Sequence, residues 1–174
     1  MYAAAFPLAV HAVGDFVASY VPSLKDFARL DPHFRLPRSA FAALPQYANW
    51  GFAVFQLREV NRETTRVHPM AFSFPVREGG KLFFPTVHIH DGKVHSKEQF
   101  DHVLYAQWGG APTANTLRFL FSPSPWRKSE KEAGSKIDVS KARGIVSGRL
   151  PMYRREVRGM LPNQDTWVSP SELT

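Results

Sequence analysis

The sequence predicts one β-rich α+β domain spanning residues 1–174, built mainly from an antiparallel twisted sheet or sandwich with a few short helices. Two observations favour this class. First, glycine and proline turn signals separate several short runs of strand-forming residues, and no alternating strand–helix units are visible. Second, the 14 Phe, 4 Trp and 5 Tyr residues supply large side chains that fill the space between layers. The connections between elements are expected to be short and hairpin-like.

Short helices are expected before residue 45. Ser23 suits the N-cap of a helix that has Leu24 and Phe27 on its apolar face, and Pro32 ends this helix soon afterwards. A second helical turn is expected between Ser39 and Leu44. Neither helix is long.

Strand-like sequence dominates residues 50–90. In the run 52–57 both sets of alternating positions carry apolar residues, so both faces of a strand would be apolar. This predicts an internal strand. Two further strand-like runs flank Gly79-Gly80, a pair that suits a two-residue hairpin turn. Because proline cannot donate a ladder hydrogen bond, the prolines inside these runs place one or both strands at a sheet edge or at a bulge.

Residues 97–107 predict a helix. Ser96 is its candidate N-cap and Gln99 the capping-box partner, while Phe100 and Leu104 lie four positions apart on one apolar face. This is the strongest helix signal in the chain.

The remaining third of the chain is expected to contain strands and a linker. A strand is predicted at 113–123, and one or two more after residue 143. Between them, residues 123–137 are rich in charge and in Ser and Pro, which predicts an exposed, flexible linker within the single domain.

Composition excludes several classes of site. Without cysteine the chain has no disulfide scaffold, thiolate zinc site, iron–sulfur cluster or cysteine nucleophile. No G-x-S-x-G elbow is present to mark a serine nucleophile. No Walker or dinucleotide-binding glycine loop is present either, which argues against nucleotide-dependent chemistry. No apolar run reaches the roughly eighteen residues of a membrane helix, so we expect a soluble protein with no membrane partner. The absence of cysteine fits a reducing, cytoplasmic location.

Histidines cluster around an Asp-Gly pair in the stretch "HIHDGKVH". A type I′ turn at Asp91-Gly92 would place His88 opposite His95 and put His90 on the same face of the hairpin. Three imidazoles on one face can bind a divalent transition metal such as zinc or iron. The alternatives are that they form the polar face of a hairpin, or that they bind a ligand or transfer a proton without a metal.

Three polar residues after this hairpin are candidates to assist such a site. Glu98, Asp101 and His102 are weak candidates for a further ligand, a group that orients a ligand, or an acid or base. In the predicted helix Glu98 and His102 point away from the apolar face. The carboxylate spacing marks no acid/base pair by itself, so whether the chain is an enzyme stays open.

Basic charge is concentrated in one segment. Residues 123–158 carry ten Lys and Arg against four Asp and Glu, or +6 of the chain's net +7. Such a segment can meet nucleic acid or another anion, or it can be a solvated loop. The candidate anion-binding residues are Arg149, Arg154, Arg155 and Arg158. On a strand, Arg154 and Arg155 would point to opposite faces.

Three functions follow from these patterns. The first is a binding or assembly protein whose sheet edge and basic segment contact a protein partner or a second copy of the chain. The second is a metal-dependent enzyme, hydrolytic or oxygen-using, centred on the histidine hairpin. The third is an anion or nucleic-acid binder built on the arginines, whose binding would weaken steeply with salt.

Overall fold

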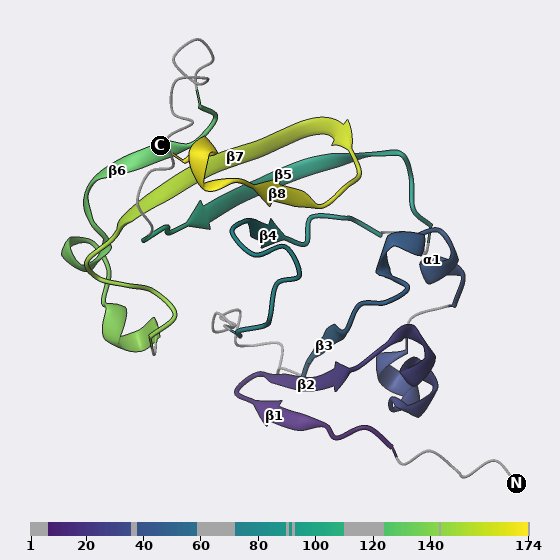
Figure 1. Ribbon diagram of the computed structural model, residues 1–174. Coiled ribbons are helices and arrows are strands. Elements are labelled where there is room, and N and C mark those ends of the chain that lie inside the picture. Colours follow the sequence, from purple (N-terminus) through teal and green to yellow (C-terminus); the bar gives the residue numbers. More distant parts are fainter. Residues whose placement is uncertain are drawn as a thin grey trace, which may run out of the picture. The chain divides into compact units, whose positions relative to one another are not determined.

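The computed structural model describes residues 7–35, 38–58, 72–89, 91, 93–109, 124–142 and 144–173. The chain divides into two compact units, one within Met1–Met70 and Ile89–Val94, the other within Ala71–His88 and His95–Thr174. Each unit has its own antiparallel pairing of strands (Figure 1). Each also has its own buried cluster. The predicted β-rich class is confirmed, since the described strands are antiparallel and the described helices are short.

The described part of the first unit contains three strands and four short helices. In chain order these are β1 (His11–Val13), β2 (Phe16–Val21), the 3-10 helices η1 (Leu24–Arg29) and η2 (Pro32–Phe34), α1 (Arg38–Ala42), η3 (Pro45–Tyr47) and β3 (Phe52–Leu57). Strand β2 lies between β1 and β3. The predicted strand at 52–57 is therefore confirmed, but it is an outer strand of the described sheet rather than an internal one.

The first unit's core is built from aromatic side chains. Val21 and Leu30 are almost fully buried. The ring of Phe27 lies 4.7 Å from that of Phe41 and 5.2 Å from that of Phe52, so η1, α1 and β3 meet at one point.

Both predicted short helices are confirmed in position. Ser23 is the N-cap residue of η1, but its hydroxyl donates to the Asp26 carboxylate instead of capping the backbone, and Ser39 lies within α1 rather than before it.

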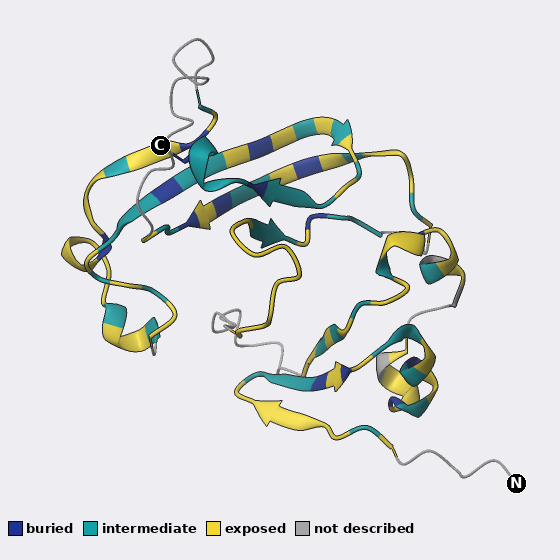
Figure 2. Ribbon diagram, in the orientation of Figure 1, coloured by how far each residue is buried: buried dark blue, intermediate teal, exposed yellow. Residues whose placement is uncertain are grey.

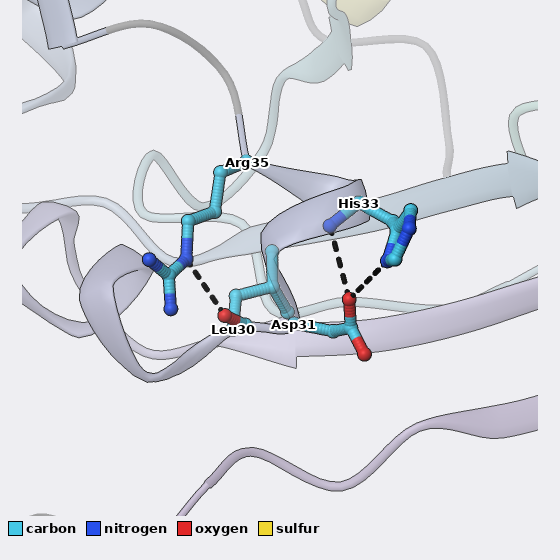
Figure 3. A network of polar contacts seen from close by, with 4 residues as sticks. All are labelled: Leu30, Asp31, His33 and Arg35. Carbon is cyan, nitrogen blue, oxygen red and sulfur yellow. Dashed lines mark hydrogen bonds and ion pairs between the residues drawn. The ribbon is translucent and has the colours of Figure 1, made fainter.

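Polar contacts define the chain path through η2 (Figure 3). Asp31 Oδ1 accepts a hydrogen bond from the His33 backbone N–H at 3.0 Å and lies 2.8 Å from the His33 ring. These bonds lower the pKa of the Asp31 carboxyl. Arg35 Nε donates to the Leu30 carbonyl at 2.8 Å, which satisfies a carbonyl at the end of η1.

Within the described ranges, no helix has the length and apolar character needed to cross a membrane.

The second unit contains two sheets. Its elements are β4 (Leu82–Phe84), β5 (Lys97–Ala106), β6 (Arg127–Glu132), η5 (Ala133–Ser135), η6 (Val139–Ala142), β7 (Pro151–Pro162), β8 (Thr166–Val168) and η7 (Pro170–Glu172). Strand β7 lies between β5 and β6, and β4 pairs with β8. The predicted strands after residue 143 are thus confirmed as β7 and β8.

One face of the β5–β7–β6 sheet carries the second unit's core. Phe100 and Leu104 of β5 and Tyr153 and Val157 of β7 are buried, and Val168 of β8 packs in the same cluster. Buried and exposed residues alternate along β5 and β7 (Figure 2). The two faces of this sheet therefore differ: the inner face meets the core, and the outer face is exposed.

The predicted helix over residues 97–107 is wrong, because the segment forms β5. Phe100 and Leu104, four residues apart, share a face in a helix and also in a strand, so their spacing could not decide between the two. Ala106 is buried and Tyr105 is exposed, as the strand period requires. Ten consecutive residues of β5 pair with β7, and this pairing outweighs the capping signal of Ser96 and Gln99.

The predicted hairpin at Gly79-Gly80 is present only as a turn. Gly80 has φ +88°, and Lys81 N–H donates to the Glu78 carbonyl at 3.4 Å. Residues 72–76 before the turn are not in a strand. Strand β4 pairs with β8 instead, so the partner strand of β4 lies near the C-terminal end of the sequence rather than across the turn.

The strand predicted at 113–123 lies outside the described residues.

Residues 124–137 belong to the second unit and do not form an irregular linker. Strand β6 pairs with β7 at the sheet edge and carries a register shift between Lys128 and Glu132. Its side chains are mostly exposed, but Trp126 before it and Ala133 after it are buried. The charges that predicted a linker are those of a solvated edge strand.

Candidate functional sites

The turn between β7 and β8 binds the extended segment that follows β4. Asp165 Oδ1 accepts hydrogen bonds from the backbone N–H groups of Thr86 at 3.0 Å and Val87 at 3.4 Å. The buried Thr86 hydroxyl donates to the Gln164 carbonyl at 2.8 Å. The backbone leading to His88 is therefore fixed by side-chain and backbone groups of this turn.

Asn163, in the same turn, forms hydrogen bonds with the backbone of two histidines. Its Oδ1 accepts from the His88 N–H at 2.8 Å, and its Nδ2 donates to the carbonyls of His88 at 2.9 Å and His95 at 3.1 Å. The Asn163 backbone N–H donates to the Ser96 carbonyl at 3.0 Å. One asparagine thus binds the backbone on both sides of residues 89–94.

The fixed backbone directs His88 toward His102. The two Nε2 atoms lie 2.5 Å apart, with the rings edge to face at a centroid distance of 4.6 Å. The ring of Phe100 stacks on His88 at 4.6 Å and meets His102 edge-on at 5.7 Å. His102 is on the inner face of β5, opposite Val157. Both imidazoles are half-buried, and their contact is made by the ring nitrogens that commonly bind protons or metals.

The residues of the predicted three-histidine site are placed differently. His95 is exposed, and its carbonyl, not its ring, meets Asn163. His90 lies outside the described residues. In the described part of the chain, no three His, Asp or Glu side chains gather so that they could hold a metal ion. The metal site of His88, His90 and His95 therefore stays a prediction, and the contact that His88 makes is with His102.

The predicted hairpin of the histidines is not a strand ladder in the described residues. Asp91 Oδ1 accepts from the Lys93 N–H at 2.9 Å, which is a local turn contact, and Gly92 lies outside the described residues. None of the described residues in 85–89 or 93–96 is in a strand. His88 and His95 are brought to one place by Asn163 rather than by cross-strand pairing.

The three residues predicted to assist the histidines divide between the two faces of β5. His102 meets His88 on the inner face. Glu98 is on that face too, but four strand residues place it roughly 13 Å further along. Asp101 is on the outer face, where its Oδ1 lies 3.3 Å from Arg158 Nε. The strand conformation, which the sequence analysis did not predict, is what turns His102 toward the core.

The outer face of the β5–β7–β6 sheet carries a row of three side chains. Tyr105 of β5 is directly opposite Arg154 of β7, and Arg154 is directly opposite Arg127 of β6. Residues directly opposite one another in a sheet project from the same face. Tyr105 is 55% exposed, and Arg127 is also exposed. The row therefore presents an exposed aromatic ring, an exposed arginine at 127 and a half-buried arginine at 154 on one face.

Two carboxylates, those of Glu156 and Asp101, lie among the arginines of this face. Arg154 binds Glu156 Oε1 at 2.6 Å, and Arg158 lies 3.5 Å from Glu156 Oε2. The hydrogen bond from Arg154 and the charge of Arg158 lower the pKa of Glu156, while the Glu156 and Tyr105 hydrogen bonds raise the pKa of Arg154. Glu156 is thus a fixed anion that offsets part of the positive charge of the face.

The arginines singled out from the sequence do not act as one group. Arg154 and Arg158 lie on the outer face, whereas Arg155 is opposite Leu104 on the inner face and is half-buried. The predicted opposite orientation of Arg154 and Arg155 is confirmed. Arg149 is exposed in the segment before β7.

Sequence reasoning missed Tyr105 and Arg127 because it placed them in a helix and a linker. Neither segment alternates strictly between apolar and polar residues, since β6 is polar throughout and β5 ends in four apolar residues. No local signal gives the register between strands.

No protein-family model matches this chain, and neither a curated protein nor a solved structure is similar to it.

Proposed function

We propose that this protein binds single-stranded nucleic acid on the outer face of the β5–β7–β6 sheet. The observation that carries the proposal is the row Tyr105, Arg154, Arg127, which runs across three strands with its ring and both guanidinium groups on one exposed face. A ring that can stack on a base, beside cations that can bind phosphate, is the combination that binding of a single strand requires.

The charge of the chain supports an anionic ligand. The net charge is +7 with a sequence pI of about 9.9, and most of the excess lies in the segment that forms β6 and β7. A positive surface of this kind raises the local concentration of an anionic ligand and speeds association with it. Arg158 adds a third cation to the face, two residues beyond Glu156 along β7.

A sheet face favours a single strand over a duplex. Specific duplex binding commonly inserts a helix or a narrow β-ribbon into the major groove. The longest described helix has six residues. An exposed tyrosine on a sheet can stack only on a base that is already unpaired, because duplex bases are stacked on each other.

Glu156 limits the affinity of this face. Its carboxylate holds Arg154 and lies near Arg158, so a phosphate must compete with it for both guanidinium groups. We therefore expect moderate affinity with little sequence preference, since bases would be read by stacking rather than by their edges.

The expected behaviour can be measured by fluorescence anisotropy with a labelled single-stranded 20-mer. Three arginine contacts predict that log K falls with log salt with a slope of about −2, and Arg154→Gln should reduce the magnitude of the slope by about 0.7. Tyr105→Ala should weaken binding roughly 10- to 100-fold, the loss typical of one stacked base.

Lys141→Gln is the matched control for charge. Lys141 is exposed on η6, outside the strands that carry the row, and lies 3.8 Å from Asp138. If Lys141→Gln weakens binding as much as Arg154→Gln does, the interaction depends on net charge alone and the proposed face is not the site. If the wild-type chain binds neither single-stranded DNA nor RNA, the proposal fails outright.

A further inference from the structure

The His88–His102 pair is the one described place where two imidazole nitrogens from separate segments face each other. The pair is unrelated to the outer face, because His102 and Tyr105 project from opposite sides of β5. Nothing in the proposed nucleic-acid binding uses these rings. The His88 ring of the pair stacks on the buried Phe100 ring.

We propose that His88 and His102 form a two-nitrogen binding site for a divalent transition-metal ion, zinc or copper(II). Imidazole is a preferred ligand of both ions, and two such nitrogens leave coordination positions open to water or to a group from another molecule. The site differs from the three-histidine hairpin predicted from the sequence, since it uses His102 on β5 and does not use His95.

The protein holds both ligands in advance. His88 is fixed through its backbone N–H and its carbonyl, both bound by Asn163. His102 is fixed within the paired part of β5. The stacked Phe100 ring restricts His88 from one side. Ligands held by such surrounding groups lose less freedom when the ion binds.

Metal binding requires only a small change in this geometry. At zinc–nitrogen distances of about 2.0–2.1 Å and a tetrahedral angle, two ligand nitrogens lie roughly 3.3 Å apart, which is about 0.8 Å more than the 2.5 Å separation of the pair. The two rings must move apart by rotation about their side-chain bonds. The proton that one Nε2 donates to the other must move to the Nδ1 of its own ring or to solvent, so that both Nε2 lone pairs face the ion.

The test is titration of the full-length chain with Zn²⁺ and, separately, with Cu²⁺. Isothermal titration calorimetry should show one saturable site per chain, and Cu²⁺ should give an electron paramagnetic resonance spectrum with nitrogen coupling from two imidazoles. His102→Gln and His88→Gln should each abolish this site. In the unmodified chain, Zn²⁺ should shift the ring resonances of His88 and His102 and leave those of His33 unchanged, which keeps the test valid if a variant misfolds.

His95→Ala is the matched control. It removes an exposed imidazole whose backbone carbonyl, not its ring, meets Asn163. Metal binding that survives His95→Ala and is lost in His102→Gln supports the pair. Loss in His95→Ala with retention in His102→Gln would overturn the pair and support the hairpin triad instead. Absence of any saturable site for either ion would also overturn it.

Discussion

Phe100→Ala is expected to lower the free energy of unfolding of the second unit by about 3–5 kcal/mol. Phe100 is 2% exposed, and its ring contacts both His88 and His102. Removal of the ring leaves a cavity at the centre of the inner face of β5, because the two paired strands cannot close around it. Urea unfolding followed by tryptophan fluorescence measures the loss, since Trp126 is in the same buried cluster.

Two further variants make this expectation specific. Phe100→Leu retains most of the volume and should cost only about 1–1.5 kcal/mol. Tyr105→Ala, on the exposed outer face, should cost about 1 kcal/mol or less, since it loses only a strand-favouring ring and its contact with Arg154. Equal losses for Phe100→Ala and Tyr105→Ala would contradict the alternation of inner and outer faces along β5.

Asn163→Ala is expected to destabilise the second unit by about 2–3 kcal/mol, because it removes three side-chain hydrogen bonds to the backbone of His88 and His95. Native-state hydrogen exchange is the direct measurement. The His88 amide should exchange much faster in the variant, while the amides of β5 that pair with β7 should keep most of their protection.

Asn163→Asp is an informative companion. It keeps the acceptor for the His88 N–H but replaces the Nδ2 donor by an oxygen that faces two carbonyl oxygens. This repulsion raises the pKa of the introduced carboxyl, and stability should therefore increase as the pH falls through that raised pKa. If Asn163→Asp has wild-type stability at neutral pH, the two donated hydrogen bonds contribute nothing.

The elements that the sequence predicted correctly are those whose conformation is decided by neighbouring residues. Ser23 and Pro32 mark the first helical segment where η1 lies, and the run 52–57 is β3. The terminal strands β7 and β8 were also expected, since strand-forming residues flank a polar turn there. In each case the residues that decide the conformation lie within a few positions of one another.

The candidate sites could be predicted only in part, because they depend on pairing between distant segments. Phe100 and Leu104 fit a helix and a strand equally well, and only pairing with β7 decides between them. The same pairing sets Tyr105 against Arg154 and turns His102 inward. His88 was singled out from its neighbours in sequence, but the partner that its ring contacts lies fourteen residues away on a strand that the sequence analysis had assigned as a helix.

The most direct test of the proposed function compares Glu156→Gln with Arg154→Gln in binding to the labelled single-stranded 20-mer. Glu156→Gln frees Arg154 from its carboxylate and leaves Arg158 with Asp101 alone, so it should tighten binding and steepen the salt dependence. Arg154→Gln should weaken binding and make the salt dependence shallower. Opposite changes in the two variants are the predicted result. Unchanged affinity in both variants would contradict the account.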